Sequence, residues 1–171
     1  LSPTHAALIV GYGSSRGNYK LMCRKEKLIA DALREYGPMI KGPVDALRYM
    51  GGFDLAAICG AMLACVKAHI PFYVDGFITA AALVCAVQLN DEVRRYALLS
   101  HLSREAGMAV ALRTVGMDES QIPIHGELSL GEGTGAVLAV SLIQSMMYAI
   151  WHMGTLDNVN ESAERRRKGG E

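Results

Sequence analysis

Residues 70–87 read IPFYVDGFITAAALVCAV, and they join a short apolar run to a longer one through the dipeptide Asp75-Gly76. The first run, residues 70–74, has the length of a buried strand. Pro71 stands near its start, where a strand tolerates a missing N–H. The second run, residues 77–87, is long and apolar enough for a buried helix. This stretch therefore predicts a strand, a polar turn and a covering helix.

Similar alternations occur along the rest of the chain. An apolar run at residues 6–10 precedes a loop rich in glycine and serine, and a predicted strand at 122–128 precedes a glycine-rich turn. Residues 92–99 predict a helical turn that passes into a strand, and residues 100–104 predict a polar loop. Helical patterns cover residues 20–34, 44–49, 53–68, 105–115 and 136–153. We therefore expect an α/β fold with a mostly parallel sheet flanked by helices, Rossmann-like and three-layered, with a small helical subdomain as an open alternative.

Length and composition suit one packed domain. The chain has 171 residues, of which 51% are hydrophobic and 20% are charged. We expect the domain to cover residues 1–156 and a polar tail, frayed helix or disorder, to follow at 157–171. The 17 basic and 17 acidic residues give a formal net charge of zero, which argues against a nucleic-acid partner. Because the chain begins at Leu1, we expect a fragment or a processed product.

Cysteine, histidine and hydropathy patterns predict a cytoplasmic protein without a membrane partner. The four cysteines show no C-x-x-C spacing, which is typical of reduced, buried thiols. The histidines show no metal-ligand spacing, so we expect neither a metal nor a cofactor. No secretory signal begins the chain. The apolar runs at 77–89 and 135–151 do not match the roughly 20 mainly apolar residues that span a membrane, and we expect both to be buried helices.

Loops that follow strands are the candidate sites, because ligands of parallel α/β folds bind outside the carboxyl ends of the strands. The first such loop contains Gly11-x-Gly13, whose amides could approach a phosphate, with Lys25 and other cations nearby on the next helix. An ordinary glycine turn beside a solvated basic helix face is the alternative.

The glycine-rich turn at 131–135, GEGTG, holds a single carboxylate, Glu132, at the start of an apolar helix. Among apolar neighbours this carboxylate would lose hydration and become a stronger base. A helix N-terminal turn whose glutamate complements the helix dipole is an equally good interpretation. For Asp75, we expect its carboxylate to cap the helix that follows it.

Four motifs then occur in order: GGFDLAA at 51–57, VDGFI at 74–78, SHLSREAG at 100–107 and LGEGTGA at 130–136. Over about residues 9–156 the chain resembles the nicotinate-nucleotide–dimethylbenzimidazole phosphoribosyltransferases, which make the lower ligand of cobalamin. The resemblance implies that ribosyl phosphate moves from nicotinate mononucleotide to 5,6-dimethylbenzimidazole or a related base, with inversion at the anomeric carbon. It also implies a homodimer. We expect the helix at 53–68 to form part of a self-association surface, and packing in the core of one chain is an equally good interpretation.

The resemblance implies specific roles for individual residues. Glu132 matches the general base, and Lys25 matches a lysine near the nucleotide phosphate. A single base is chemically sufficient, because the pyridinium leaving group needs no acid and the incoming benzimidazole loses one N–H proton. The remaining substrate-binding positions are Gly11, Gly13, Leu130, Gly131 and Gly133. Asp75 and His101 lie in matching motifs without an assigned chemical step.

Two departures from the family pattern qualify this expectation. Ser129 stands where an arginine usually precedes Leu-Gly-Glu-Gly, and the chain has about half the family's length, without the Gly-Ile-Gly-Asn-Thr-Thr stretch. The chain is then a fragment, a partner of a second chain carrying the missing N-terminal half, or an inactive relative. A non-catalytic nucleotide- or base-binding subunit of a heteromer, or a purely structural partner, is the competing hypothesis.

Overall fold

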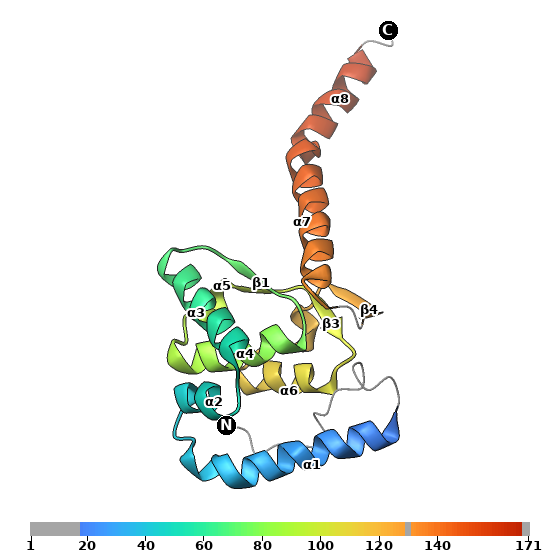
Figure 1. Cartoon of the computed structure of the whole chain (residues 1–171). Coiled ribbons are helices and arrows are strands. Elements are labelled where there is room, and N and C mark those ends of the chain that lie inside the picture. The colour runs from blue at the N-terminus through green and yellow to red at the C-terminus, as the bar shows by residue number, and fades with distance from the viewer. Residues whose placement is uncertain (1–17, 129–130, 169–171) are drawn as a thin grey trace. The chain divides into compact units, whose positions relative to one another are not determined.

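The structure is a computed structural model that describes residues 18–128 and 131–168. The chain forms two compact units, residues 1–139 and residues 140–171. The predicted strand at 6–10 lies outside the described residues. Helices and short strands alternate along the first unit, and the second unit is helical (Figure 1).

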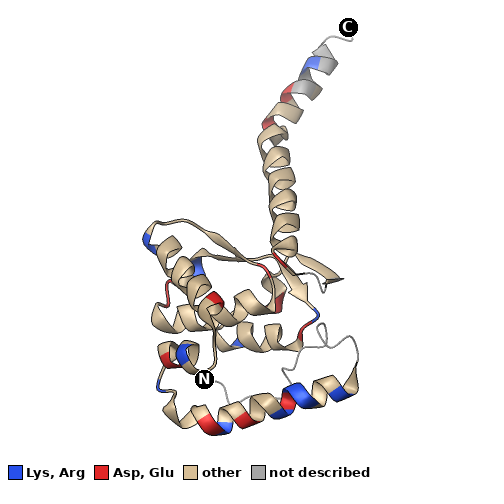
Figure 2. Cartoon of the chain, in the orientation of Figure 1, with Lys and Arg blue, Asp and Glu red and all other residues tan. Residues whose placement is uncertain are grey.

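The first helix, α1 (Tyr19–Tyr36), confirms the predicted amphipathic helix at 20–34. It begins where the side chain of Asn18 accepts a hydrogen bond from the amide of Leu21 at 3.2 Å, which is an N-cap. It ends at Gly37-Pro38, where the short 3-10 helix η3 (Gly37–Met39) follows. Charges of both signs are interspersed along α1 (Figure 2), and the helix buries none of its residues.

The core of the first unit is built around α4 (Phe77–Leu89), which packs against four other helices of the unit. These are α2 (Pro43–Tyr49), α3 (Phe53–Lys67), α5 (Val93–Tyr96) and α6 (Ala106–Thr114). Alanines on α4 let its neighbours approach closely, and Leu83, Met108 and Leu112 are the largest fully buried apolar side chains. All of these helices follow the sequence prediction to within a few residues.

The strands are short and parallel. β1 (Phe72–Val74) pairs with β2 (Ala97–Leu99), and β3 (His101–Ser103) pairs with β4 (Ile124–Leu128). Parallel pairing confirms one part of the fold prediction. The expected single sheet between two layers of helices is not found, since the described strands form two separate two-stranded sheets. The reason is that one extended stretch, residues 97–103, pairs with β1 through its first half and with β4 through its second half.

The polar loop predicted at 100–104 is wrong, because β3 occupies most of it. Ser100 and His101 are buried there, with His101 only 1% exposed. Polar side chains can be buried when they are hydrogen-bonded, and the Ser100 hydroxyl is satisfied by backbone carbonyls.

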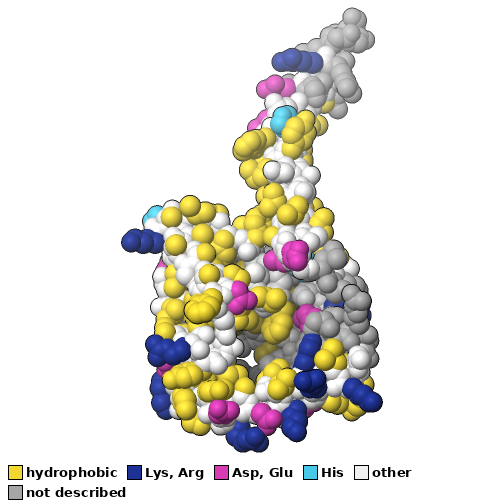
Figure 3. Space-filling view, viewed as in Figure 1, with side chains coloured by type: hydrophobic (Ala, Val, Ile, Leu, Met, Phe, Trp, Pro, Cys, Tyr) yellow, Lys and Arg dark blue, Asp and Glu magenta, His cyan; other side chains and the backbone are white. Residues whose placement is uncertain are grey.

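The last predicted helix is α7 (Thr134–His152), which begins in the first unit and continues into the second. We expected it to be buried, but from Val140 onward its side chains are exposed and largely hydrophobic (Figure 3). By length and composition α7 could span a membrane, with a mean hydropathy of 1.4 over its most apolar window.

The tail forms a further helix, α8 (Leu156–Lys168), so the helical alternative of our prediction is confirmed. Its start is fixed by a reciprocal cap. The amide of Thr155 donates to Asn158 Oδ1 at 2.9 Å, and the amide of Asn158 donates to Thr155 Oγ1 at 3.3 Å.

Candidate active site

Three of the loops that follow strands meet in space. Asp75 follows β1, and its carboxylate accepts two hydrogen bonds from the turn after β4. The amide of Gly133 donates to Oδ2 at 3.2 Å, and the amide of Ala136 donates to Oδ1 at 3.0 Å. Ser100, which follows β2, lies against the backbone of Asp75. The residues Asp75 and Ser100 and the turn around Glu132 therefore lie side by side, and they form the candidate site.

Asp75 is a helix cap, but of a different helix from the one that the sequence suggests. The start of α4 is capped by Thr79, whose hydroxyl donates to the carbonyl of Gly76 at 2.8 Å and accepts from its amide at 2.9 Å. Because Thr79 serves α4, the carboxylate of Asp75 is available to the first turn of α7. Local sequence suggests the cap, whereas the identity of the helix depends on a contact 58 to 61 residues away.

A buried polar pair supports Asp75. The Ser100 hydroxyl lies 2.8 Å from the carbonyl oxygen of Val74, 2.9 Å from that of Asp75 and 3.2 Å from His101 Nδ1. His101 Nδ1 is in turn 4.0 Å from Asp75 Oδ1. The second ring nitrogen of His101, Nε2, is buried and has no hydrogen-bond partner among the residues that the structure describes.

Two positions of the turn, Gly133 and Gly135, require glycine for different physical reasons. Gly133 has a φ of 82°, a left-handed conformation that glycine adopts at little cost. Gly135 has no room for a side chain, because a Cβ built there would overlap the His101 ring. The turn is closed by Thr134, whose amide and hydroxyl both donate to the carbonyl of Gly131, at 3.3 and 2.8 Å.

Glu132 lies in the left-handed region with a φ of 61°, which is unusual for a residue other than glycine. The other such residue among those described, His69, ends α3, where a left-handed residue commonly closes a helix. Glu132 has no such local reason, and unexplained backbone strain of this kind clusters at functional sites. The sequence predicts desolvation of its carboxylate, but the structure places Glu132 exposed, because no described side chain covers it.

The other predicted binding residues are only partly visible. Lys25 lies on α1 in a half-buried position. Gly11, Gly13, Leu130 and Ser129 lie outside the described residues. Gly131 is described and exposed, and its carbonyl helps to form the turn. Of the predicted substrate-binding residues, the structure therefore describes only Lys25, Gly131 and Gly133.

Sequence reasoning placed Ser100 and His101 in a polar loop, so it missed their burial, and it missed Gly135 as a support of the site. One signal was present, since leucines at 98, 99 and 102 flank the pair on both sides. The overlap between Gly135 and the His101 ring had no sequence signal, because it joins two distant segments.

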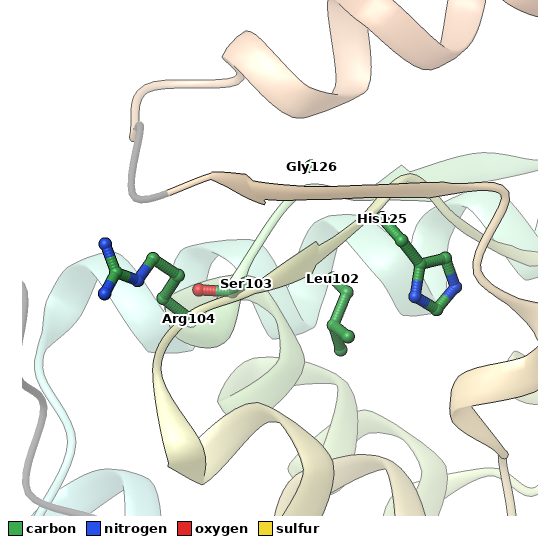
Figure 4. Close-up of a pocket in the computed structure, with 5 residues that line it drawn as sticks. All are labelled: Leu102, Ser103, Arg104, His125 and Gly126. Atoms are coloured by element: carbon green, nitrogen blue, oxygen red, sulfur yellow. The ribbon is translucent and has the colours of Figure 1, made fainter.

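A separate hollow of about 200 Å³ lies beside β3 and β4. It is lined by Leu102, Ser103, Arg104, His125 and Gly126. In Figure 4, Leu102 and His125 lie on the same side of the strand pair, whereas Arg104 points away from both. His125 Nε2 donates to the carbonyl of Ile122 at 3.0 Å. These side chains do not converge on one point, so the hollow does not define a second reaction centre.

Metal and thiol chemistry find little support in the part of the chain that the structure describes. No group of three or more His, Cys, Asp or Glu side chains there could hold a metal ion. Burial raises the pKa of the Cys59 and Cys85 thiols above the usual value, with the nearby Cys59 adding to the effect at Cys85. A raised pKa leaves less thiolate and so a weaker nucleophile.

The fold and the site together define an α/β protein with a carboxylate-bearing turn at the carboxyl ends of parallel strands. A family model described as "Phosphoribosyltransferase" matches residues 1–160. The chain therefore belongs to this family, the dimethylbenzimidazole phosphoribosyltransferases, as its motifs suggest.

Relatives of known name agree with this assignment. The chain is 33% identical over 156 residues to nicotinate-nucleotide–dimethylbenzimidazole phosphoribosyltransferase of Clostridium tetani, covering 91% of this chain and 42% of the relative. It is 34% identical over 148 residues to the protein of that name from Escherichia coli K12, covering 86% and 40%. A crystal structure of CobT from Thermus thermophilus superposes with a TM-score of 0.77 at 33% identity, covering 91% of this chain and 45% of that one. The chain thus spans less than half the length of the relatives it matches.

Proposed function

We propose that this chain supplies the general base of a nicotinate-nucleotide–dimethylbenzimidazole phosphoribosyltransferase. The bond between C1′ of the ribose phosphate and the nicotinate nitrogen would break, and a bond from C1′ to a benzimidazole nitrogen would form on the opposite face. Nicotinate leaves with the electron pair of the broken bond and needs no proton. The proton on the benzimidazole nitrogen passes to the Glu132 carboxylate.

One observation carries this proposal. Glu132 stands in a left-handed conformation in a turn whose following amides are held by Asp75, at the carboxyl end of β4. Such a turn presents the carboxylate at the position where ligands of parallel α/β folds bind. The family membership and the names of its relatives support the choice of reaction.

The chain also needs a partner to complete this site. Glu132 is exposed here, whereas a base works best where water is excluded and both rings are held in position. We propose that a second polypeptide, either another copy of this chain or one with the remaining length of the family, covers the turn. The structure joins none of the four cysteines in a disulfide, which is compatible with the cytoplasmic location that we propose for this assembly.

Helix α7 is the best candidate for contact with this partner. A helix that is hydrophobic all round is normally buried. Its exposed apolar residues in the second unit include Leu142, Ile143, Met146, Met147, Tyr148, Ile150 and Trp151. The exposed face of α3, with Ala57, Gly60, Ala61 and Ala64, is our second candidate and stays a prediction.

Light scattering tests this partner. We expect the chain to self-associate, or to form a stable complex when it is co-expressed with the N-terminal part of the Clostridium tetani relative. We call this co-expressed pair the complemented chain. A monodisperse monomer in both preparations would contradict the proposal. Co-flotation of the chain with neutral phospholipid vesicles, lost on replacing Trp151 and Ile150 by serine, would instead show that α7 binds lipid.

Turnover tests the function itself. The complemented chain, given nicotinate mononucleotide and dimethylbenzimidazole, should release nicotinate and form the α-riboside phosphate, both measured by mass spectrometry. The chain alone should be a poor catalyst, because a phosphate normally needs several N–H donors besides one cation. Binding of both substrates by the complemented chain without any product would favour the competing function, a non-catalytic base-binding subunit.

A further inference from the structure

The carboxylate of Asp75 accepts hydrogen bonds from two backbone amides that follow Glu132, yet it carries no step in the proposed reaction. Each of its oxygens accepts one amide hydrogen, from Gly133 at 3.2 Å and from Ala136 at 3.0 Å. The Gly133 amide belongs to the peptide group that directly follows Glu132. Fixing that peptide group fixes the ψ angle of Glu132, and with it the direction in which its side chain leaves the turn.

We propose that Asp75 is a positioning residue that holds Glu132 in its left-handed conformation, an inference that rests on the proposed function. Without the two hydrogen bonds, the turn would relax toward the more favourable right-handed or extended backbone. The carboxylate of Glu132 would then spend less time beside the benzimidazole nitrogen.

The surroundings of Asp75 are built to keep its carboxylate in place. The Ser100 hydroxyl binds the backbone carbonyl of Asp75 at 2.9 Å, and this hydroxyl is itself buried. The His101 ring lies 4.0 Å from Asp75 Oδ1 and occupies the space that Gly135 leaves by lacking a side chain. The backbone of Asp75 and one oxygen of its carboxylate therefore lie against buried neighbours.

A plain helix cap would use the same hydrogen bonds, so the two roles must be separated by measurement. A cap stabilises α7 and affects turnover only through folding. A positioning residue acts on kcat through Glu132, and its effect disappears when Glu132 can no longer accept a proton. A double-mutant cycle distinguishes these cases.

Asp75→Asn is the variant of choice, because it keeps the shape and one acceptor oxygen but turns an NH₂ group toward one of the two amides. In the complemented chain we expect kcat to fall about 10- to 100-fold, as small misplacements of a catalytic group do, with KM little changed. In the Glu132→Gln background the same substitution should add little further loss. Asp118→Asn is the matched control, since Asp118 caps the 3-10 helix η4 (Glu119–Gln121) away from the site and should leave kcat unchanged.

Amide hydrogen exchange of the full chain gives a readout that does not depend on catalysis. The Gly133 and Ala136 amides should be protected in the wild type and exchange faster in Asp75→Asn, but not in Asp118→Asn. Unprotected wild-type amides would overturn the proposal even if the variant failed to fold.

The two proposals fail in different ways. Losses that multiply in the double variant, with Glu132→Gln itself impaired, would overturn the positioning role and leave the base assignment standing. Wild-type turnover of Glu132→Gln would refute the base, and with it the catalytic role of Asp75. Protected amides would then leave Asp75 as a cap of α7 alone.

Discussion

Helices α4 and α7 are both long and strongly apolar, but they differ in how many of their residues are buried. α4 buries six of its residues, Ala80, Ala82, Leu83, Cys85, Ala86 and Val87, whereas α7 buries only Gly135 and Ala139 near its start. α4 finds α3 and α6 on either side within its own unit. α7 buries apolar residues only in its N-terminal part, next to the candidate site. An apolar helix in the sequence thus predicts that the helix packs against something. The structure is needed to show whether the described chain contains that neighbour.

Leucine-to-alanine substitutions should show the largest difference in stability effect between the two helices. Leu83→Ala on α4 removes a fully buried side chain and should lower the free energy of unfolding by about 2–5 kcal/mol. Leu142→Ala on α7 removes a side chain that is 40% exposed and should change it by less than about 0.5 kcal/mol. Urea denaturation of the chain alone measures both. Equal losses would contradict the contrast, and in the complemented chain Leu142→Ala should weaken association instead.

The first turn of α7 should behave like the buried helix α4. Gly135→Ala would drive a methyl group into the His101 ring and should cost about 1–3 kcal/mol in stability. Gly60→Ala on α3 is the control, because a Cβ there meets nothing within 4 Å and alanine favours the helix by about 0.5–1 kcal/mol. Opposite shifts in the melting temperature are expected. A harmless Gly135→Ala would show that the His101 contact is not tight.

The smallest expected change in stability concerns Asp118, which lies outside both helices and serves as a reference for them. Hydrogen bonds from Ser120 lower the pKa of this carboxyl below its usual value. Its contribution to stability is therefore present above the pKa of an unfolded aspartate and is lost as the pH falls through the lower, folded value. Asp118→Asn should slightly flatten the acid limb of the stability–pH curve. An unchanged acid limb would contradict this assignment.

Local patterns predicted the helices well, since periodicity and caps act within a few residues. The helix predicted at 20–34, which is α1, and the passage from α5 into β2 both follow from neighbouring residues. What the sequence did not predict depends on distant contacts. Examples are the burial of Ser100 and His101 in β3, the choice of α7 by Asp75, and the exposure of Glu132 and of the later part of α7.

Turnover of the Glu132→Gln variant tests the central claim most directly. Glutamine keeps the size and can still hydrogen-bond the benzimidazole nitrogen, but it cannot accept its proton. In the complemented chain kcat should fall about 10²–10⁴-fold while substrate binding is largely kept, since the proton moves in the chemical step. Glu92→Gln, on an exposed glutamate paired with Arg95, is the control and should leave kcat unchanged. Turnover of Glu132→Gln near the wild-type value would show that Glu132 is not the base.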